Sequence, residues 1–115
     1  MHEEILTTTN IYDGRVIKLS LHDVRLPDGS EAKRELVYHP GAVALVAVDA
    51  DGKLLLVRQY RIAARRVMLE IPAGTLEAGE PPDVCAVREL QEETGYKPGH
   101  LHKLGGIFVA PGYTT

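Results

Sequence analysis

A stretch of 23 residues, Gly74 to Tyr96, constrains this chain more than any other segment. It reads GTLEAGEPPDVCAVRELQEETGY, and near its end three carboxylates fall within five residues, at Glu89, Glu92 and Glu93. At about 100° per residue on a helix, these three side chains share one arc about 100° wide. Apolar residues expected to anchor the helix fall on the other side: Val84, Val87 and Leu90. Carboxylates this close repel one another unless a cation lies between them, and a hard divalent cation that prefers oxygen is the natural candidate.

The ends of this predicted helix carry recognisable signals. Pro81 and Pro82 suit a first helical turn, where proline's missing N–H is not needed. Asp83 complements the helix dipole at that end, and Gly95 predicts a left-handed C-cap. A solvated acidic face on an amphipathic helix is the simpler alternative for the glutamates.

The composition is that of an ordinary globular domain. A length of 115 residues predicts one domain, and 44% hydrophobic with 25% charged residues is typical of soluble proteins. The net charge of −3 gives no indication of nucleic-acid binding, and no apolar run approaches the roughly 18 residues of a membrane span. The N-terminus is polar and lacks the apolar segment of a signal peptide. With its single Cys85, expected to be inertly packed, the chain fits a reducing cytoplasm.

The N-terminal third predicts a β-element. Apolar residues partly alternate through residues 11–26, Pro27-Asp28-Gly29 is a strong turn signal, and a second strand is expected through Glu35–Tyr38. Together they predict a hairpin. The break at residues 39–41 then divides an N-terminal element, residues 1–40, from a main body, residues 41–115.

The main body alternates apolar runs with turns. Residues 42–48 predict a strand buried on both faces, and residues 53–60 another strand. Residues 61–67 are basic and predict a loop, before a short strand at 68–71. Residues 101–109 predict a further strand with a bulge at Gly105-Gly106. With one helix among strands, the pattern predicts an α+β or α/β fold.

The stretch from Gly74 to Tyr96 resembles the Nudix box, and it matches all nine positions that the box fixes. Four flanking segments resemble the ADP-ribose pyrophosphatase branch of the Nudix hydrolases: HPGAVALVAVD, LLLVRQYRIAA, LEIPAG and APGY. Pro111 lies 16 residues beyond Gly95, where that branch has a proline. The resemblance implies an α/β/α sandwich around a mixed sheet, with the N-terminal β-hairpin as an added element. Relatives usually continue past the position of Thr115, so we expect a C-terminally truncated chain with an incomplete core.

The resemblance also implies a metal site. Glu89 and Glu93 are expected to bind Mg²⁺ or Mn²⁺ directly, together with the main-chain carbonyl of Ala73. Glu92 would hold a further metal ion or orient its water, and the number of metal ions stays open. Glu80 and Arg88 are expected to pair and hold the loop against the helix.

Substrate contacts are implied outside the box. Arg61 is the best candidate for binding the diphosphate, since a guanidinium donates two parallel hydrogen bonds. Arg34 and Glu35 correspond to residues that the partner subunit contributes in this branch, and Arg15 stands where an aromatic residue often lines the adenine. The Pro111-Gly112 turn completes the set. The general base is expected beyond Thr115, or else Glu92 or Glu93 must serve.

The implied activity is hydrolysis of the pyrophosphate of ADP-ribose, giving AMP and ribose 5-phosphate. The implied assembly is a homodimer, without nucleic-acid or membrane partners. Two alternatives stay open: a pyrophosphatase of the GDP-mannose type, and a Nudix module that binds ADP-ribose without cleaving it. Activity on a panel of substrates distinguishes the GDP-mannose type from the ADP-ribose type. The residues after Thr115 bear on whether the module cleaves ADP-ribose or only binds it.

Overall fold

The computed structural model describes all 115 residues, from Met1 to Thr115. They form two compact units. The first contains Met1–Pro40 together with Gly105–Thr115, and the second contains Gly41–Leu104. Residues 105–115, which the sequence analysis assigned to the main body, thus belong with the N-terminal element.

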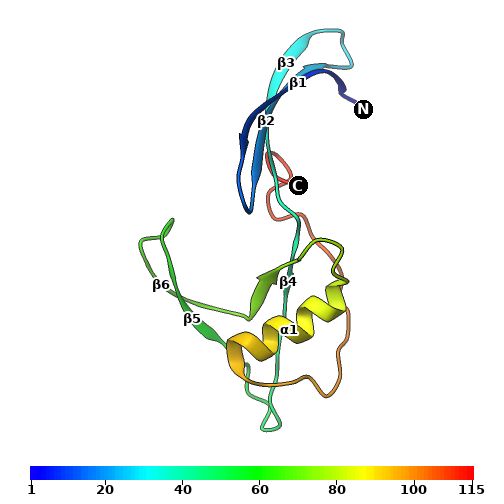
Figure 1. Ribbon diagram of the computed structural model, residues 1–115. Coiled ribbons are helices and arrows are strands. Elements are labelled where there is room, and N and C mark those ends of the chain that lie inside the picture. The colour runs from blue at the N-terminus through cyan, green and yellow to red at the C-terminus, as the bar shows by residue number, and fades with distance from the viewer. The chain divides into compact units, whose positions relative to one another are not determined.

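The first unit is built on a three-stranded antiparallel sheet in the order β1 (Glu4–Asp13), β2 (Lys18–Arg25), β3 (Glu31–Tyr38) (Figure 1). The expected hairpin was therefore incomplete, because β1 precedes it and residues 11–26 form parts of two strands. Gly14 starts the turn between them, and its N–H donates to the carbonyl of Ile17 at 2.9 Å. The β2–β3 turn is where the sequence predicted it, with Gly29 at φ 86°.

One face of β2 is buried, and its polar residues are satisfied there. Ser20, His22 and Val24 alternate along the strand and are each at most 7% exposed. The His22 ring lies 3.0 Å from the Thr8 hydroxyl through Nδ1 and 3.0 Å from the Tyr38 hydroxyl through Nε2. These bonds tie all three strands together across the buried face.

The C-terminal residues add to the outer edge of β3. Val37 donates its N–H to the carbonyl of Tyr113 at 2.8 Å, and Thr115 donates its N–H to the carbonyl of Val37 at 3.1 Å. The resulting bridge between Val37 and Thr114 is parallel, whereas every ladder between strands is antiparallel. The strand expected over residues 101–109 is absent, and this prediction was wrong. Its apolar pattern finds no neighbouring strand to pair with, and Gly105 interrupts it at φ 148°.

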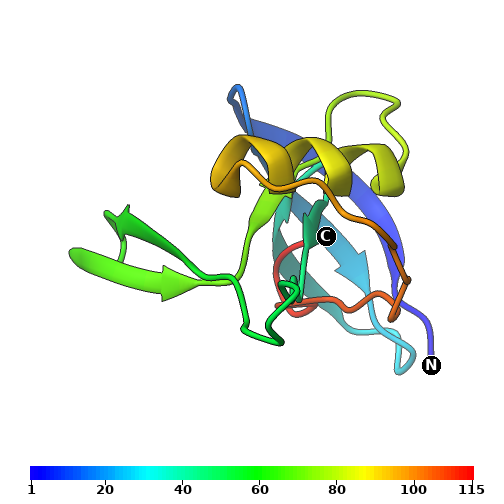
Figure 2. The same ribbon diagram turned by 90° about the horizontal axis from the view of Figure 1, so that it is seen from below.

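The second unit holds two short antiparallel pairs and the helix. β4 (Ala42–Ala44) pairs with β7 (Ala73–Thr75), and β5 (Val57–Arg61) pairs with β6 (Arg66–Glu70). Both views show the β5–β6 hairpin projecting away from the helix α1 (Pro82–Thr94) (Figure 1, Figure 2).

Two strand predictions and one loop prediction for this unit need correction. The strand expected over 42–48 is limited to β4 plus an isolated bridge at Val48, and its burial alternates, with Leu45 7% and Val46 61% exposed. The strand expected over 53–60 starts at Val57. The basic loop expected over 61–67 is a tight turn whose ends, Arg61 and Arg66, already face each other in the ladder.

The helix ends as predicted, but its packed side differs. Pro81 precedes the first turn, and Gly95 caps the C-terminus at φ 77°, donating its N–H to the carbonyl of Gln91 at 2.9 Å. Val84 and Val87, predicted as anchors, are 55% and 37% exposed. Leu90, the third predicted anchor, is buried as expected, together with Cys85 and Ala86.

A small core lies where α1 meets β4 and β7. Leu45, Ala86 and Leu90 form its centre, with Val43 and Ala47 packed against it. The single helix is too short and too polar to cross a membrane.

Candidate active site

Two of the three clustered glutamates lie on the packed side of α1. Glu89 and Glu93 follow the buried Cys85 at intervals of four residues, so all three occupy one face of the helix. That face meets β7. The N–H of Ala73 donates to Glu93 Oε2 at 3.0 Å. Main-chain atoms of β7 therefore help to hold the carboxylate in place.

Gly74 makes room for the second carboxylate. A Cβ built on Gly74 would overlap the Glu89 carboxylate, because that group lies directly against the glycine main chain. A side chain at position 74 would therefore displace Glu89. The two carboxylates converge on consecutive residues of β7, Ala73 and Gly74.

Glu92 takes a different direction. Its side chain is 60% exposed, and it accepts a hydrogen bond from Arg88 Nη1 at 3.4 Å. The structure has no group of three or more Asp, Glu, His or Cys side chains arranged to hold a metal ion. The expected single acidic face is thus divided, because the arc of the three glutamates straddles the boundary between the packed and the exposed sides of α1.

Arg88 links the loop before α1 to the carboxylates. Its Nε and Nη2 donate to the two oxygens of Glu80, each at 2.9 Å, and its Nη1 donates to Glu89 Oε1 at 2.7 Å. The Glu80 side chain is only 10% exposed. The expected Glu80–Arg88 pair is present, and it extends to Glu89.

Electrostatics favour the charged forms of this pair. The hydrogen bonds from Arg88, with a further one from the Glu77 N–H, lower the pKa of Glu80 to about 2. The same contacts with Glu80, and then with Glu89, raise the pKa of Arg88 above its usual range. Both groups therefore stay ionised across the physiological pH range.

Cys85 lies fully buried beneath β7. Its thiol is 3.7 Å from the carbonyl oxygen of Thr75 and 4.0 Å from that of Gly74. Burial raises the pKa of Cys85 to about 11, so the thiol stays protonated. The prediction of an inert, packed cysteine is confirmed.

Arg61 is held by an unpredicted partner, Glu70. The shortest contact of this ion pair, Nη2 to Oε2, is 2.6 Å. The hydrogen bonding to Glu70 raises the pKa of Arg61, and the charge of Glu93 adds a smaller increase. Arg61 therefore lies within electrostatic reach of the acidic side of α1. A prediction that these two segments pair as an antiparallel hairpin across a tight turn would have identified Glu70 as a partner of Arg61.

The other predicted substrate residues belong to the first unit. Arg34 pairs with Glu3, at 2.7 Å between Nη2 and Oε1, and Glu35 points to the opposite face of β3. Arg15 is exposed in the β1–β2 turn. Pro111 and Gly112 lie in the turn that precedes the residues paired with β3.

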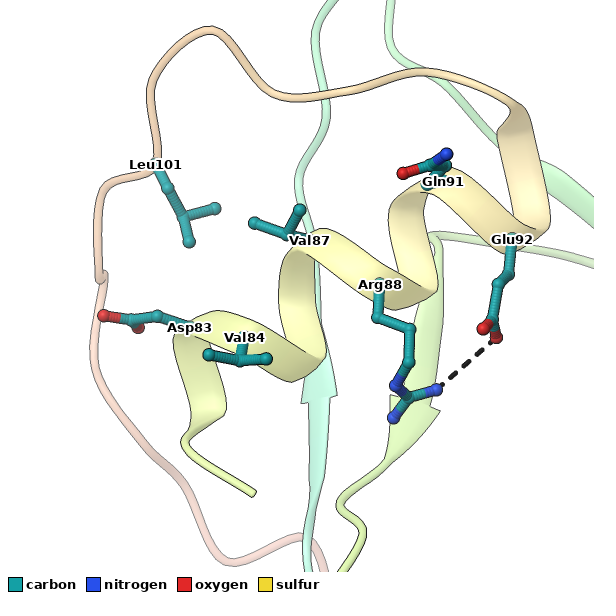
Figure 3. A pocket seen from close by; sticks show the side chains of 7 residues that line it. All are labelled: Asp83, Val84, Val87, Arg88, Gln91, Glu92 and Leu101. Carbon is teal, nitrogen blue, oxygen red and sulfur yellow. Dashed lines mark hydrogen bonds and ion pairs between the residues drawn. The ribbon is translucent and has the colours of Figure 1, made fainter.

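A groove on the outward face of α1 is distinct from the convergence of Glu89 and Glu93. Figure 3 shows its lining, in which Leu101 points toward Val84 and Val87, while Arg88 and Glu92 pair along the helix. The groove has a volume of about 910 Å³. It is lined by neither Glu89 nor Glu93, and of the candidate metal residues only Glu92 borders it.

Comparisons of the sequence with known proteins identify the family. Residues 37–114 match the NUDIX domain, and the chain belongs to that family. It is 46% identical to the ADP-ribose pyrophosphatase of Bacillus subtilis (strain 168), over 98% of this chain and 61% of that protein. It is 47% identical to the methanol dehydrogenase activator of Bacillus methanolicus, over 96% of this chain and 60% of that protein.

A solved structure shows the same fold. The crystal structure of an ADP compounds hydrolase matches with a TM-score of 0.87 and 26% identity, covering 100% of this chain and 63% of that one. The expected fold class, α+β of the Nudix type, is confirmed. The chain spans about 60% of the length of the curated relatives described above.

Proposed function

We propose that this chain carries the active site of a Nudix pyrophosphohydrolase that cleaves ADP-ribose into AMP and ribose 5-phosphate, in a reducing cytoplasm. The observation that carries the proposal is the convergence of Glu89 and Glu93 on Ala73 and Gly74. A relative at 46% identity is named ADP-ribose pyrophosphatase, which favours this substrate over other nucleoside diphosphate sugars.

The residues at this convergence fit a divalent cation. Carboxylate and carbonyl oxygens are the ligands that Mg²⁺ and Mn²⁺ prefer, and Mg²⁺ needs only one or two carboxylates beside waters and substrate phosphates. Glu89, Glu93 and the carbonyl of Ala73 would hold Mg²⁺ or Mn²⁺, while the exposed Glu92 would hold a further ion or orient its water. A bound cation would neutralise the diphosphate and lower the pKa of a coordinated water.

In this proposal, residues outside the candidate metal site hold the substrate. Arg61, near the acidic side of α1, binds the diphosphate with the remaining N–H groups of its fork. Arg34 and Glu35, donated by the partner subunit of the proposed homodimer, contact the nucleotide sugar, Arg15 stacks on the adenine, and the Pro111-Gly112 turn lines the site. Glu80 and Arg88 keep Glu89 in position.

The proposal is tested by a substrate panel with product analysis. With Mg²⁺ present, we expect ADP-ribose to be cleaved with a higher kcat/KM than GDP-mannose or diadenosine polyphosphates. Chromatography of the products should show AMP and ribose 5-phosphate in equal amounts. A preference for either competing substrate would reassign the specificity, and binding of ADP-ribose without cleavage would identify a non-catalytic module.

A homodimer with shared sites is part of the proposal. The chain passes between the two units at Pro40–Gly41 and again at Leu104–Gly105, and the sheet of the first unit carries Arg34 and Glu35. These residues resemble ones that a partner subunit donates in the ADP-ribose pyrophosphatase branch. Two-fold dimers are also the commonest oligomers of soluble proteins.

Mixing two variants with different defects tests the shared site. Arg34→Ala should weaken substrate binding and leave cation binding unchanged, whereas Glu89→Gln should abolish turnover. Mixed dimers of the two should regain activity, because one of their two sites keeps both residues. A monomer in light scattering at the assay concentration, with full activity, would rule out a shared site.

A further inference from the structure

Arg61 and Glu70 occupy the same face of the β5–β6 hairpin. In the ladder, Arg61 faces Arg66 and Val57 faces Glu70. Along each strand the two positions are an even number of residues apart, so their side chains lie on the same face of the hairpin. The Arg61 side chain runs back along this face to reach Glu70. Its Nε donates to Oε1 at 2.9 Å and to Oε2 at 3.1 Å, and its Nη2 donates to Oε2 at 2.6 Å.

These contacts fix which edge of the guanidinium is free. A guanidinium has five N–H groups, one on Nε and two on each Nη. Glu70 accepts hydrogen bonds from the N–H of Nε and from one N–H of Nη2. Both N–H groups of Nη1 and the second one of Nη2 remain. They form the edge that faces away from Glu70, and two parallel N–H groups of this kind match a phosphate in bidentate geometry.

The segment that carries Glu70 also leads to the carboxylates of α1. Two residues separate Glu70 from Ala73, and one of them is Pro72, which is fully buried. Ala73 then donates its N–H to Glu93, whose charge acts on Arg61. A single short stretch therefore anchors both the arginine and the candidate metal-binding glutamate.

We propose that Glu70 is a positioning residue, which presents the Nη1–Nη2 edge of Arg61 to the diphosphate of the substrate. This inference rests on the proposed function, in which Arg61 binds that diphosphate. Without Glu70, the long Arg61 side chain, which is 46% exposed, would have to be ordered by the substrate itself. Binding would then cost more conformational entropy.

The alternative is an exposed ion pair with no part in binding. Such pairs contribute little to stability. Under this alternative, removal of Glu70 would leave KM unchanged. The two roles differ in what they predict for the substrate. Only the positioning role makes the effect of Glu70 on KM depend on the presence of Arg61.

A double-mutant cycle separates these roles. Glu70→Ala should raise KM for ADP-ribose between about twofold and tenfold, with kcat and the affinity for Mn²⁺ retained. In an Arg61→Ala background the same change should have no further effect on KM. Glu31→Ala removes a carboxylate from another exposed ion pair, with Arg25, and should leave KM unchanged.

Each outcome has a defined meaning. An unchanged KM in Glu70→Ala, or an equal rise in KM with and without Arg61, would overturn the positioning role while leaving the proposed function intact. An unchanged KM in Arg61→Ala would remove Arg61 from the substrate site, and the inference with it. Failure of the wild-type protein to bind and hydrolyse ADP-ribose would overturn the proposed function itself.

Discussion

Replacement of Glu93 by glutamine is expected to lower the turnover of ADP-ribose by about 10²-fold or more, a loss of at least about 2.7 kcal/mol of transition-state stabilisation. The amide keeps an oxygen that can accept the N–H of Ala73, so the helix should stay docked on β7. It lacks the negative charge that strengthens the binding of a divalent cation by a carboxylate. Initial rates over a range of Mg²⁺ concentrations measure the effect.

The matched control for Glu93→Gln is Glu77→Gln. Glu77 lies in the exposed loop before α1, and its side chain forms no ion pair in the structure. This control makes the same chemical change and should retain wild-type turnover. Turnover of Glu93→Gln equal to wild type, with dependence on Mg²⁺ retained, would remove Glu93 from the active site.

Gly74→Ala is expected to have a comparably large effect from a single added methyl group. The new Cβ would overlap the Glu89 carboxylate, so either that side chain or β7 must move. Displacement of Glu89 also breaks its contact with Arg88. We expect a loss of turnover of about 10²-fold, the scale on which small misplacements act in active sites, together with weaker binding of Mn²⁺ in a titration.

Gly99→Ala is the corresponding control for Gly74→Ala. A Cβ on Gly99 meets no atom within 4 Å, so this variant should keep both turnover and Mn²⁺ affinity. If Gly74→Ala behaved like Gly99→Ala, the close approach of Glu89 to β7 would have no part in the active site.

Local signals explain what the sequence alone could predict. Prolines at one end of α1 and Gly95 at the other act within a few residues, so both ends of the helix were predicted correctly. The turn at Gly29 is equally local, since it depends on one residue with positive φ. The Glu80–Arg88 pair was predicted from the resemblance to the Nudix box, and it is present.

Pairing between distant segments explains the errors. Residues 101–109 have a strand-like composition, but a strand also needs a partner, and these residues pair with no other strand. The face of α1 was predicted only in part, with Leu90 correct and Val84 and Val87 wrong, because a helical wheel counts apolar residues. The wheel could not show that β7 offers a main-chain N–H at Ala73 and a bare backbone at Gly74, which draw two glutamates to the packed side.

The buried position of Cys85 also makes it a reporter of motion. The thiol is sealed between α1 and β7, and no other cysteine is present in the chain. A water-soluble thiol reagent can reach it only when the helix separates from the strand, because the closed state excludes solvent. The rate of modification thus measures how often α1 separates from β7, where Glu89 and Glu93 are arranged. A ligand that bridges the helix and the strand would lower this rate.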